Sequence, residues 1–204
     1  MPPGGGAPAT TGIRNVPMRR CWPRLLRPAS GIGSRCDFDD FPPMAIHVVL
    51  VHPEIHWNTG NAGRTCLATG ARLHLIEPLG FSLDERQGKR AGLDYWEQVD
   101  LCVWRHWDQF EQVLPSLGEP YFFSTKAARL LWDAPLGEPD DVVLIFGRET
   151  GGLPAELHER YGDRFVGMPI ASPLVRSLNL STSVAVAVYE VLRQRRAGRG
   201  SNPR

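Results

Sequence analysis

The sequence is poor in cysteine and has no long apolar run. Only four of its 204 residues are cysteine, and they are widely spaced, with no CxxC pair and no secretory segment before them. This pattern argues against a disulfide framework and a zinc site, and it favours a reducing, cytoplasmic compartment. No stretch approaches the roughly 20 apolar residues that cross a bilayer, so we expect no membrane segment.

An excess of positive charge is also missing. Lysine and arginine number 23 against 22 aspartates and glutamates, for a net charge of +1, so any contact with RNA must come from local basic clusters. Arg86, Lys89 and Arg90 form one cluster, which we predict to bind RNA phosphates. A second cluster near the C-terminus has the composition of a solvated helix end. It consists of Arg193, Arg195, Arg196 and Arg199.

Residues 1–43 are rich in proline, glycine and arginine and show no periodic apolar pattern. They are expected to be a disordered extension, an Arg-rich transit peptide, or residues upstream of the true start. The onset of periodic sequence at Met44 favours the last of these. Residues 44–197 then form one domain, and residues 198–204 form a flexible tail.

Short apolar runs alternate with amphipathic segments from Met44 onward. This predicts an α/β fold with a mostly parallel six-stranded sheet and helices on both faces. The predicted strands, rich in β-branched and aromatic residues, are Ile46–Val51, Leu73–Glu77, Leu101–Trp104, Tyr121–Ser124, Val142–Phe146 and Phe165–Met168. The predicted helices are Asn61–Thr69, Trp107–Leu114, Pro154–Tyr161 and Ser181–Arg196.

The last predicted helix is apolar around much of its circumference. Val184, Val188 and Val191 mark one face, whereas Val186 and Tyr189 lie on others. One stripe packed against the sheet leaves the remaining apolar surface exposed, so we expect a homodimer through this helix.

Three polar segments follow predicted strands, and ligands of parallel α/β sheets gather beyond the strands' carboxyl ends. In the first, Asn58–Arg64, Gly60 and Asn61 are expected to turn the chain and open a helix whose N-terminus attracts anions, with Arg64 in its first turn. Taken alone, the segment fits an ordinary capped helix with a solvated arginine better. Trp57, directly before it, is the tryptophan best placed to stack on an RNA base.

The second segment, Phe146–Leu153, holds three glycines, which permit close backbone approach to a ligand. It lacks the Lys-Ser or Lys-Thr of a phosphate-binding loop, so its amides would bind a nucleoside. A tight strand-to-helix loop, with Pro154 at the first helical position, explains it equally well.

The third segment, Met168–Ser181, ends where Ser181 or Thr182 can cap the last helix. Asn179 lies before that cap, where neither capping nor burial explains it. We therefore expect Asn179 to hold backbone or substrate.

In this order, the three segments closely resemble the three motifs of the SpoU branch of the SPOUT RNA methyltransferases, over about Met44 to Arg196. Ile76–Phe81 and Arg90–Tyr95 further resemble the short, single-domain subfamily that methylates the wobble ribose, at cytidine or uridine 34, of tRNA. The resemblance implies a tRNA substrate, S-adenosyl-L-methionine as methyl donor, S-adenosyl-L-homocysteine as product, no metal, and a C-terminal deep trefoil knot.

The resemblance also implies residue roles. The catalytic positions of the family match Arg64, Asn58, Glu149, Ser177 and Asn179. The cofactor-binding positions match Phe123, Gly147, Met168 and Ser177, with Ile170 and Leu178 beside them. A sulfonium methyl is already activated, so the enzyme must orient the 2′-hydroxyl and help it lose its proton. Because an arginine stays protonated in proteins, Arg64 is expected to orient the hydroxyl and help electrostatically.

Two other functions stay open. The chain could methylate another tRNA site or ribosomal RNA, or it could be a non-catalytic RNA-binding module with the same fold. Family members that act on ribosomal RNA often add an N-terminal RNA-binding domain, which residues 1–43 cannot form. The presence of Arg64, Glu149, Ser177 and Asn179 argues against loss of catalysis.

Overall fold

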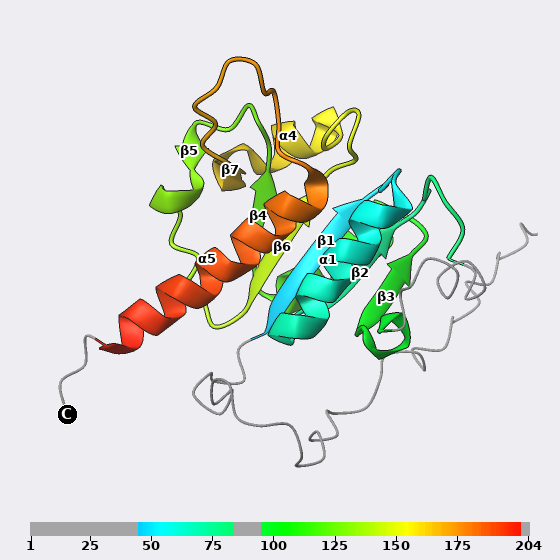
Figure 1. Cartoon of the computed structure of the whole chain (residues 1–204), viewed down its shortest axis with the longest axis horizontal. Coiled ribbons are helices and arrows are strands. Elements are labelled where there is room, and N and C mark those ends of the chain that lie inside the picture. The colour runs from blue at the N-terminus through cyan, green and yellow to red at the C-terminus, as the bar shows by residue number, and fades with distance from the viewer. Residues whose placement is uncertain (1–44, 84–94, 201–204) are drawn as a thin grey trace, which may run out of the picture. The chain divides into compact units, whose positions relative to one another are not determined.

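The computed structural model describes residues 45–83 and 95–200. Within these ranges the chain forms one sheet of seven strands with helices on both faces (Figure 1). The strands are β1 (Ile46–Val51), β2 (Arg72–Ile76), β3 (Leu101–Trp104), β4 (Glu119–Phe123), β5 (Arg129–Leu130), β6 (Val142–Phe146) and β7 (Phe165–Gly167). The α-helices are α1 (His56–Thr69), α3 (Trp107–Leu117), α4 (Ala155–Tyr161) and α5 (Leu180–Gly200). Short 3-10 helices are η2 (Trp96–Gln98), η3 (Leu131–Asp133) and η4 (Gly162–Arg164).

The strand order is β3-β2-β1-β6-β4-β7-β5, and every neighbouring pair is parallel. At the centre, Leu50 of β1 pairs with Phe146 of β6. Every residue of these two strands is buried. They are continuous apolar runs because helices cover both faces of the sheet.

Alternate residues of each strand pack against different helices. On one face, Leu50 shares a core with Val188 of α5 and with residues of α1, and these two helices lie side by side (Figure 1). On the other face, Val49 packs with Phe110 of α3 and Leu157 of α4. The valine stripe predicted for the last helix is the buried face of α5. No helix within the described ranges is long and apolar enough to cross a membrane.

The predicted fold class is confirmed, and all six predicted strands are present. The seventh strand, β5, is missing from the prediction. It has two residues, of which Arg129 pairs with Val166 of β7, and so short a strand shows no apolar period.

Several helix boundaries differ from the prediction. α1 begins at His56 instead of Asn61, α3 continues past Pro115, and α5 continues to Gly200, so residues 198–200 extend the helix. Residues 1–44 and 201–204, which include the predicted extension and the rest of the predicted tail, lie outside the described residues.

Candidate functional site

The carboxyl ends of three neighbouring strands bring predicted cofactor residues to one edge of the sheet. Phe123, the last residue of β4, pairs with Phe146 of β6 and with Val166 of β7. Gly147 directly follows Phe146, and Met168 directly follows β7. Phe123 is buried and stacks on Phe146, with ring centroids 4.4 Å apart. These positions thus share the edge at which ligands of parallel sheets bind.

The beginning of α1 corrects the expectation for the first segment. Gly60 and Asn61 lie inside the helix and do not turn the chain, and Arg64 lies beyond its first turn. The glycines serve packing: Gly60 is buried, and a Cβ on Gly63 would lie 2.5 Å from the Trp96 ring. Glycine was therefore a misleading turn signal here, because close contact with an aromatic ring also selects it.

Polar residues from all three segments join at this edge. The Glu149 carboxylate accepts hydrogen bonds from the backbone N–H of Glu54 at 2.8 Å and of Ile55 at 3.3 Å, and from Asn58 Nδ2 at 2.8 Å. Asn179 Nδ2 donates to Asn58 Oδ1 at 2.8 Å. The carboxylate therefore occupies the beginning of α1, where we expected an external anion, and an anion is stabilised there by the helix dipole.

A second carboxylate makes this arrangement reciprocal. The Glu54 carboxylate accepts hydrogen bonds from Thr150 N at 3.1 Å and from Thr150 Oγ1 at 2.9 Å. Each of the two loops thus offers a carboxylate to the backbone of the other. We name the five residues Glu54, Asn58, Glu149, Thr150 and Asn179 the motif junction. Because Asn58 is only 5% exposed, its bonds are shielded from water and costly to break.

Asn179 is the N-cap of α5, which corrects the predicted cap at Ser181 or Thr182. Its Oδ1 accepts hydrogen bonds from Ser181 N at 2.9 Å, Ser181 Oγ at 2.7 Å and Thr182 N at 3.4 Å. Capping therefore does explain Asn179, and its amide nitrogen remains available for Asn58. The Asn179 side chain thus both caps α5 and contacts Asn58 of α1.

The loop after β6 closes very tightly. The Gly152 N–H donates to Arg148 O at 2.9 Å, and Gly152 has a φ of 68°. A Cβ on Gly147 would overlap the backbone of Gly152 and Leu153. Glycine is thus required at both positions, for close approach at Gly147 and for a left-handed backbone at Gly152.

His52, directly after β1, contributes no positive charge to this edge at neutral pH. The backbone φ of His52 is 54°, and its backbone N–H donates to Ile76 O at 3.0 Å. Burial lowers the pKa of His52, and the nearby Arg148 guanidinium lowers that pKa further. The imidazole is therefore neutral at pH 7.

Arg64 contacts Tyr95, which is not a residue of the motif junction. Arg64 is exposed, and its guanidinium carbon lies 4.6 Å from the centroid of the Tyr95 ring. The Tyr95 hydroxyl donates to Gly60 O at 3.1 Å. A cation over an aromatic face is attracted by the ring. Tyr95 is itself hydrogen-bonded to the backbone of α1, so its ring orients the Arg64 side chain of the same helix.

The segment between β7 and α5 carries the remaining predicted residues. Met168 packs against the core, and Ile170 is partly buried. Ser177 and Leu178 are exposed and follow an exposed stretch of polar and apolar residues. The structure thus places Ser177 and Leu178 next to Asn179 in the chain, on an accessible surface.

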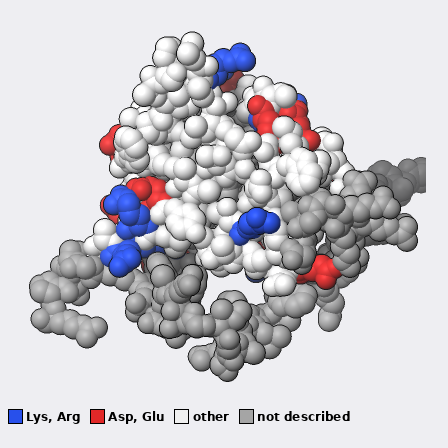
Figure 2. Space-filling view, in the orientation of Figure 1, with Lys and Arg blue, Asp and Glu red and all other residues white. Residues whose placement is uncertain are grey.

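The basic clusters have different outcomes. Arg86, Lys89 and Arg90 lie outside the described residues. On the face seen in Figure 2, the basic side chains lie in separate spots and form no single patch.

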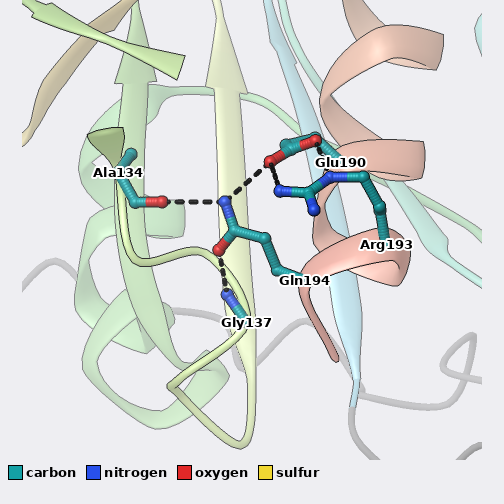
Figure 3. A network of polar contacts seen from close by, with 5 residues as sticks. All are labelled: Ala134, Gly137, Glu190, Arg193 and Gln194. Carbon is teal, nitrogen blue, oxygen red and sulfur yellow. Dashed lines mark hydrogen bonds and ion pairs between the residues drawn. The ribbon is translucent and has the colours of Figure 1, made fainter. Parts of the chain in front are cut away.

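The C-terminal cluster is divided: Arg193 and Arg196 are exposed, whereas Arg195 is buried. Arg193 binds the Glu190 carboxylate, at 2.8 Å and 2.7 Å, and Gln194 ties α5 to Ala134 and Gly137 (Figure 3). Arg195 is buried and donates to the backbone oxygen of Asp140. The expectation of a solvated helix end is therefore wrong for Arg195.

Sequence reasoning missed Glu54, Thr150 and Tyr95. Glu54 follows β1 closely, so a carboxylate at the carboxyl end of a central strand was a usable signal. Thr150 and Tyr95 gave no signal of their own, because each acts through contacts with residues far away in the sequence.

Comparisons with known proteins place the chain in a family. A model of the SpoU rRNA Methylase family matches residues 45–189. The chain is 48% identical over 150 residues to a tRNA (cytidine(34)-2'-O)-methyltransferase of Burkholderia cenocepacia (strain HI2424), across 72% of this chain and 94% of that protein. A solved structure from a study of the 2-OH methylation of C/U34 on tRNA has 42% identity and a TM-score of 0.69, across 76% of this chain and 99% of the other.

A more distant structure shares the fold. The SpoU methyltransferase AviRb from Streptomyces viridochromogenes, in complex with AdoMet, has 19% identity and a TM-score of 0.66, across 79% of this chain and 66% of the other. The family match covers the whole described sheet and the three motif segments. This chain therefore belongs to the SpoU rRNA Methylase family.

Proposed function

We propose that this protein transfers a methyl group from S-adenosyl-L-methionine to the ribose 2′-hydroxyl of nucleotide 34, a cytidine or uridine, of tRNA. The observation that carries the proposal is the 48% identity, over nearly the full length of the relative, to an enzyme named for cytidine 34 of tRNA. The motif junction supports it, because residues of all three motif segments meet at one sheet edge.

The residues present fit the methyl donor. Gly147 has no room for a side chain, so the loop presents its backbone, and Phe123 and Met168 add apolar surface beside it. Backbone amides and apolar side chains suit an adenosine, whose base is flat and whose edges carry hydrogen-bonding groups. We assign Phe123, Gly147, Met168, Ile170, Ser177 and Leu178 to binding the cofactor, within the trefoil knot that the family resemblance implies.

S-adenosyl-L-methionine, when bound, supplies an activated sulfonium methyl. The protein must then align the 2′-oxygen with that methyl and assist loss of the hydroxyl proton. We assign Arg64 to orienting the hydroxyl and to stabilising its developing negative charge, because its guanidinium is exposed and fixed by Tyr95. Asn58, Glu149 and Asn179 hold the loops in register, and we assign Ser177, which is exposed, to the reaction as the family resemblance implies.

We also propose a homodimer and a cytoplasmic location. Val186 and Tyr189 of α5 are 41% and 57% exposed, so this helix keeps apolar surface outside the core. A second copy would cover this apolar surface. Light scattering of the purified full chain measures the mass of the particle, and a monomer at micromolar concentration contradicts the dimer.

The central experiment is transfer of labelled methyl from S-adenosyl-L-methionine to bulk tRNA, followed by nuclease digestion and mass spectrometry of the nucleosides. We expect label in 2′-O-methylcytidine or 2′-O-methyluridine, mapped to position 34. Arg64→Ala should bind the cofactor normally and transfer no methyl. Labelled ribosomal RNA with unlabelled tRNA would keep the chemistry and reject the substrate, whereas tight cofactor binding without any transfer would support the non-catalytic module.

A further inference from the structure

The exposed side of α1 carries aromatic rings that the proposed reaction does not use. Trp57, in the first turn of the helix, is 50% exposed. Its ring centroid lies 4.6 Å from that of His56, and the His56 ring lies 6.4 Å from Phe81. We name His56, Trp57 and Phe81 the aromatic shelf. An exposed ring already held by its neighbours loses little freedom when a flat ligand binds.

The shelf rests on backbone that the motif junction holds. The N–H of Gly80, next to Phe81, donates to Pro53 O at 2.9 Å, and a Cβ on Gly80 would lie 2.6 Å from Glu54 O. The backbone before Phe81 therefore packs against the loop that contains Pro53 and Glu54. The next two amides of that loop, of Glu54 and Ile55, donate to Glu149. The position of the shelf is therefore coupled to that of the candidate site.

Trp57 lies on the same face of α1 as Arg64. Residues seven apart point in nearly the same direction on a helix and lie about 10 Å apart along its axis. Asn61 lies between them, and all three side chains are exposed. A guanidinium binds ribose or phosphate oxygens, and an exposed indole stacks on a base. This combination of groups fits single-stranded RNA.

We propose that the aromatic shelf stacks on a base about three nucleotides from the target nucleotide in the RNA loop. The inference rests on the proposed function, because it takes Arg64 as the residue that meets the target ribose. One stacking step along a strand is about 3.4 Å, so the separation of about 10 Å from Arg64 places on Trp57 a base about three steps along the strand from the target ribose. The shelf holds the loop in place without reading its sequence, because every base has a π-face.

The test measures binding of a fluorescent anticodon stem-loop RNA to the full chain by anisotropy, at saturating S-adenosyl-L-homocysteine. Loss of one base stack weakens binding about 5- to 150-fold, which corresponds to about 1–3 kcal/mol. Trp57→Ala should show this loss, and Trp57→Phe should recover most of it. The matched control is Trp132→Ala in η3, because Trp132 is 66% exposed and should leave the affinity unchanged.

An abasic RNA identifies the partner base. The bases two to four nucleotides from nucleotide 34 are removed one at a time. One of these removals should weaken RNA binding by the wild type to the level of Trp57→Ala, and the same removal should not weaken binding by the variant any further. Equal binding by wild type and Trp57→Ala overturns the proposal. It is also overturned if the effect of Trp57→Ala disappears only when the base of nucleotide 34 itself is removed. A monomeric Trp57→Ala protein also overturns it, because the shelf is then a contact between copies. If the coupling is found but tRNA is not methylated, the proposed function fails and the shelf stands.

Discussion

Asn179 donates a hydrogen bond of 2.8 Å to Asn58, which is 121 residues earlier in the chain. Asn179 also caps α5, and Asn58 also donates to Glu149, which holds the beginning of α1. Two helices and one loop therefore share a single set of hydrogen bonds. A displacement of any one of them must break a bond in the others.

Substitutions of Asn179 separate its two roles. Asn179→Ala removes the cap, which costs about 1 kcal/mol of stability. It also leaves Asn58 Oδ1 without its donor, which costs about 1–3 kcal/mol more. Asn179→Asp keeps an oxygen for the amides of Ser181 and Thr182, but it has no hydrogen for Asn58. We expect Asn179→Asp to be the more stable variant in denaturant unfolding, while both lose methyl transfer. Equal stability of the two variants would contradict the capping role.

Asn58→Asp places a carboxylate beside Glu149 without a change in volume. Two adjacent carboxylates repel each other, so the folded state raises the pKa of the pair above its unfolded value. The stability of the variant should therefore be nearest to wild type at pH 5 and fall as the pH rises to 7.5. Melting temperatures at the two pH values measure this effect. Asn61→Asp, at an exposed position of α1, is the control and should show no comparable fall.

The sequence predicted the strands well and the loop contacts poorly. Buried strands such as β1 and β6 are continuous apolar runs, because both faces of each strand meet helices. The segments after them were recognised as functional by position and family resemblance. The contact between Glu54 and Thr150 joins residues 96 apart, and no local pattern encodes such a pair.

The two wrong helix starts have different physical causes. Gly60 indicated a turn but lies inside α1, where Gly63 makes room for Trp96. Ser181 and Thr182 suit a cap, but Asn179 reaches the same amides one residue ahead of α5. The contact of Gly63 with Trp96 is tertiary, so local propensity could not reveal it. The cap by Asn179 is local, and asparagine is a preferred N-cap residue, so the sequence did carry a signal for it.

Gly147→Ala should abolish cofactor binding. Its Cβ would overlap the backbone of Gly152 and Leu153, so the loop must open at the proposed cofactor edge. Calorimetric titration with S-adenosyl-L-homocysteine measures the affinity, and thermal unfolding measures the accompanying loss of stability. Gly162→Ala is the control, because nothing lies within 4 Å of a Cβ there. Cofactor binding by Gly147→Ala at wild-type affinity would reject this loop as the binding site.

Tyr95 should act on transfer through Arg64. Tyr95→Phe keeps the ring beneath the guanidinium and loses only the hydrogen bond to Gly60 O. Tyr95→Leu loses both, and a cation–π contact of about 0.5–1 kcal/mol at an exposed site predicts a further loss of several-fold in kcat. The affinity for S-adenosyl-L-homocysteine should be the same in both variants. If the two variants turn over equally, the ring does not position Arg64.

The buried pair His47 and His74 predicts acid sensitivity of the fold. Trp104 Nε1 donates to His74 Nδ1 at 3.1 Å, so the His74 proton lies on Nε2 and is donated to His47 Nδ1 at 2.9 Å. Protonation of either ring would set two N–H groups against each other. Burial, and then the Arg72 charge, lower the pKa of His47 to about 4. Burial, His47 and Arg72 lower the pKa of His74 well below its ordinary value.

Because both pKa values are lower in the folded state, the unfolded chain binds more protons below pH 6.5. Stability should therefore be complete above pH 6.5 and fall as the pH drops toward 4. One pKa unit corresponds to about 1.4 kcal/mol, so His47 alone accounts for a loss on the order of 3 kcal/mol. His47→Gln keeps an acceptor for His74 and cannot titrate, so the slope of unfolding free energy against pH should become shallower. The exposed His106→Gln should leave this slope unchanged, and an unchanged slope in His47→Gln would show that the pair does not cause the acid sensitivity.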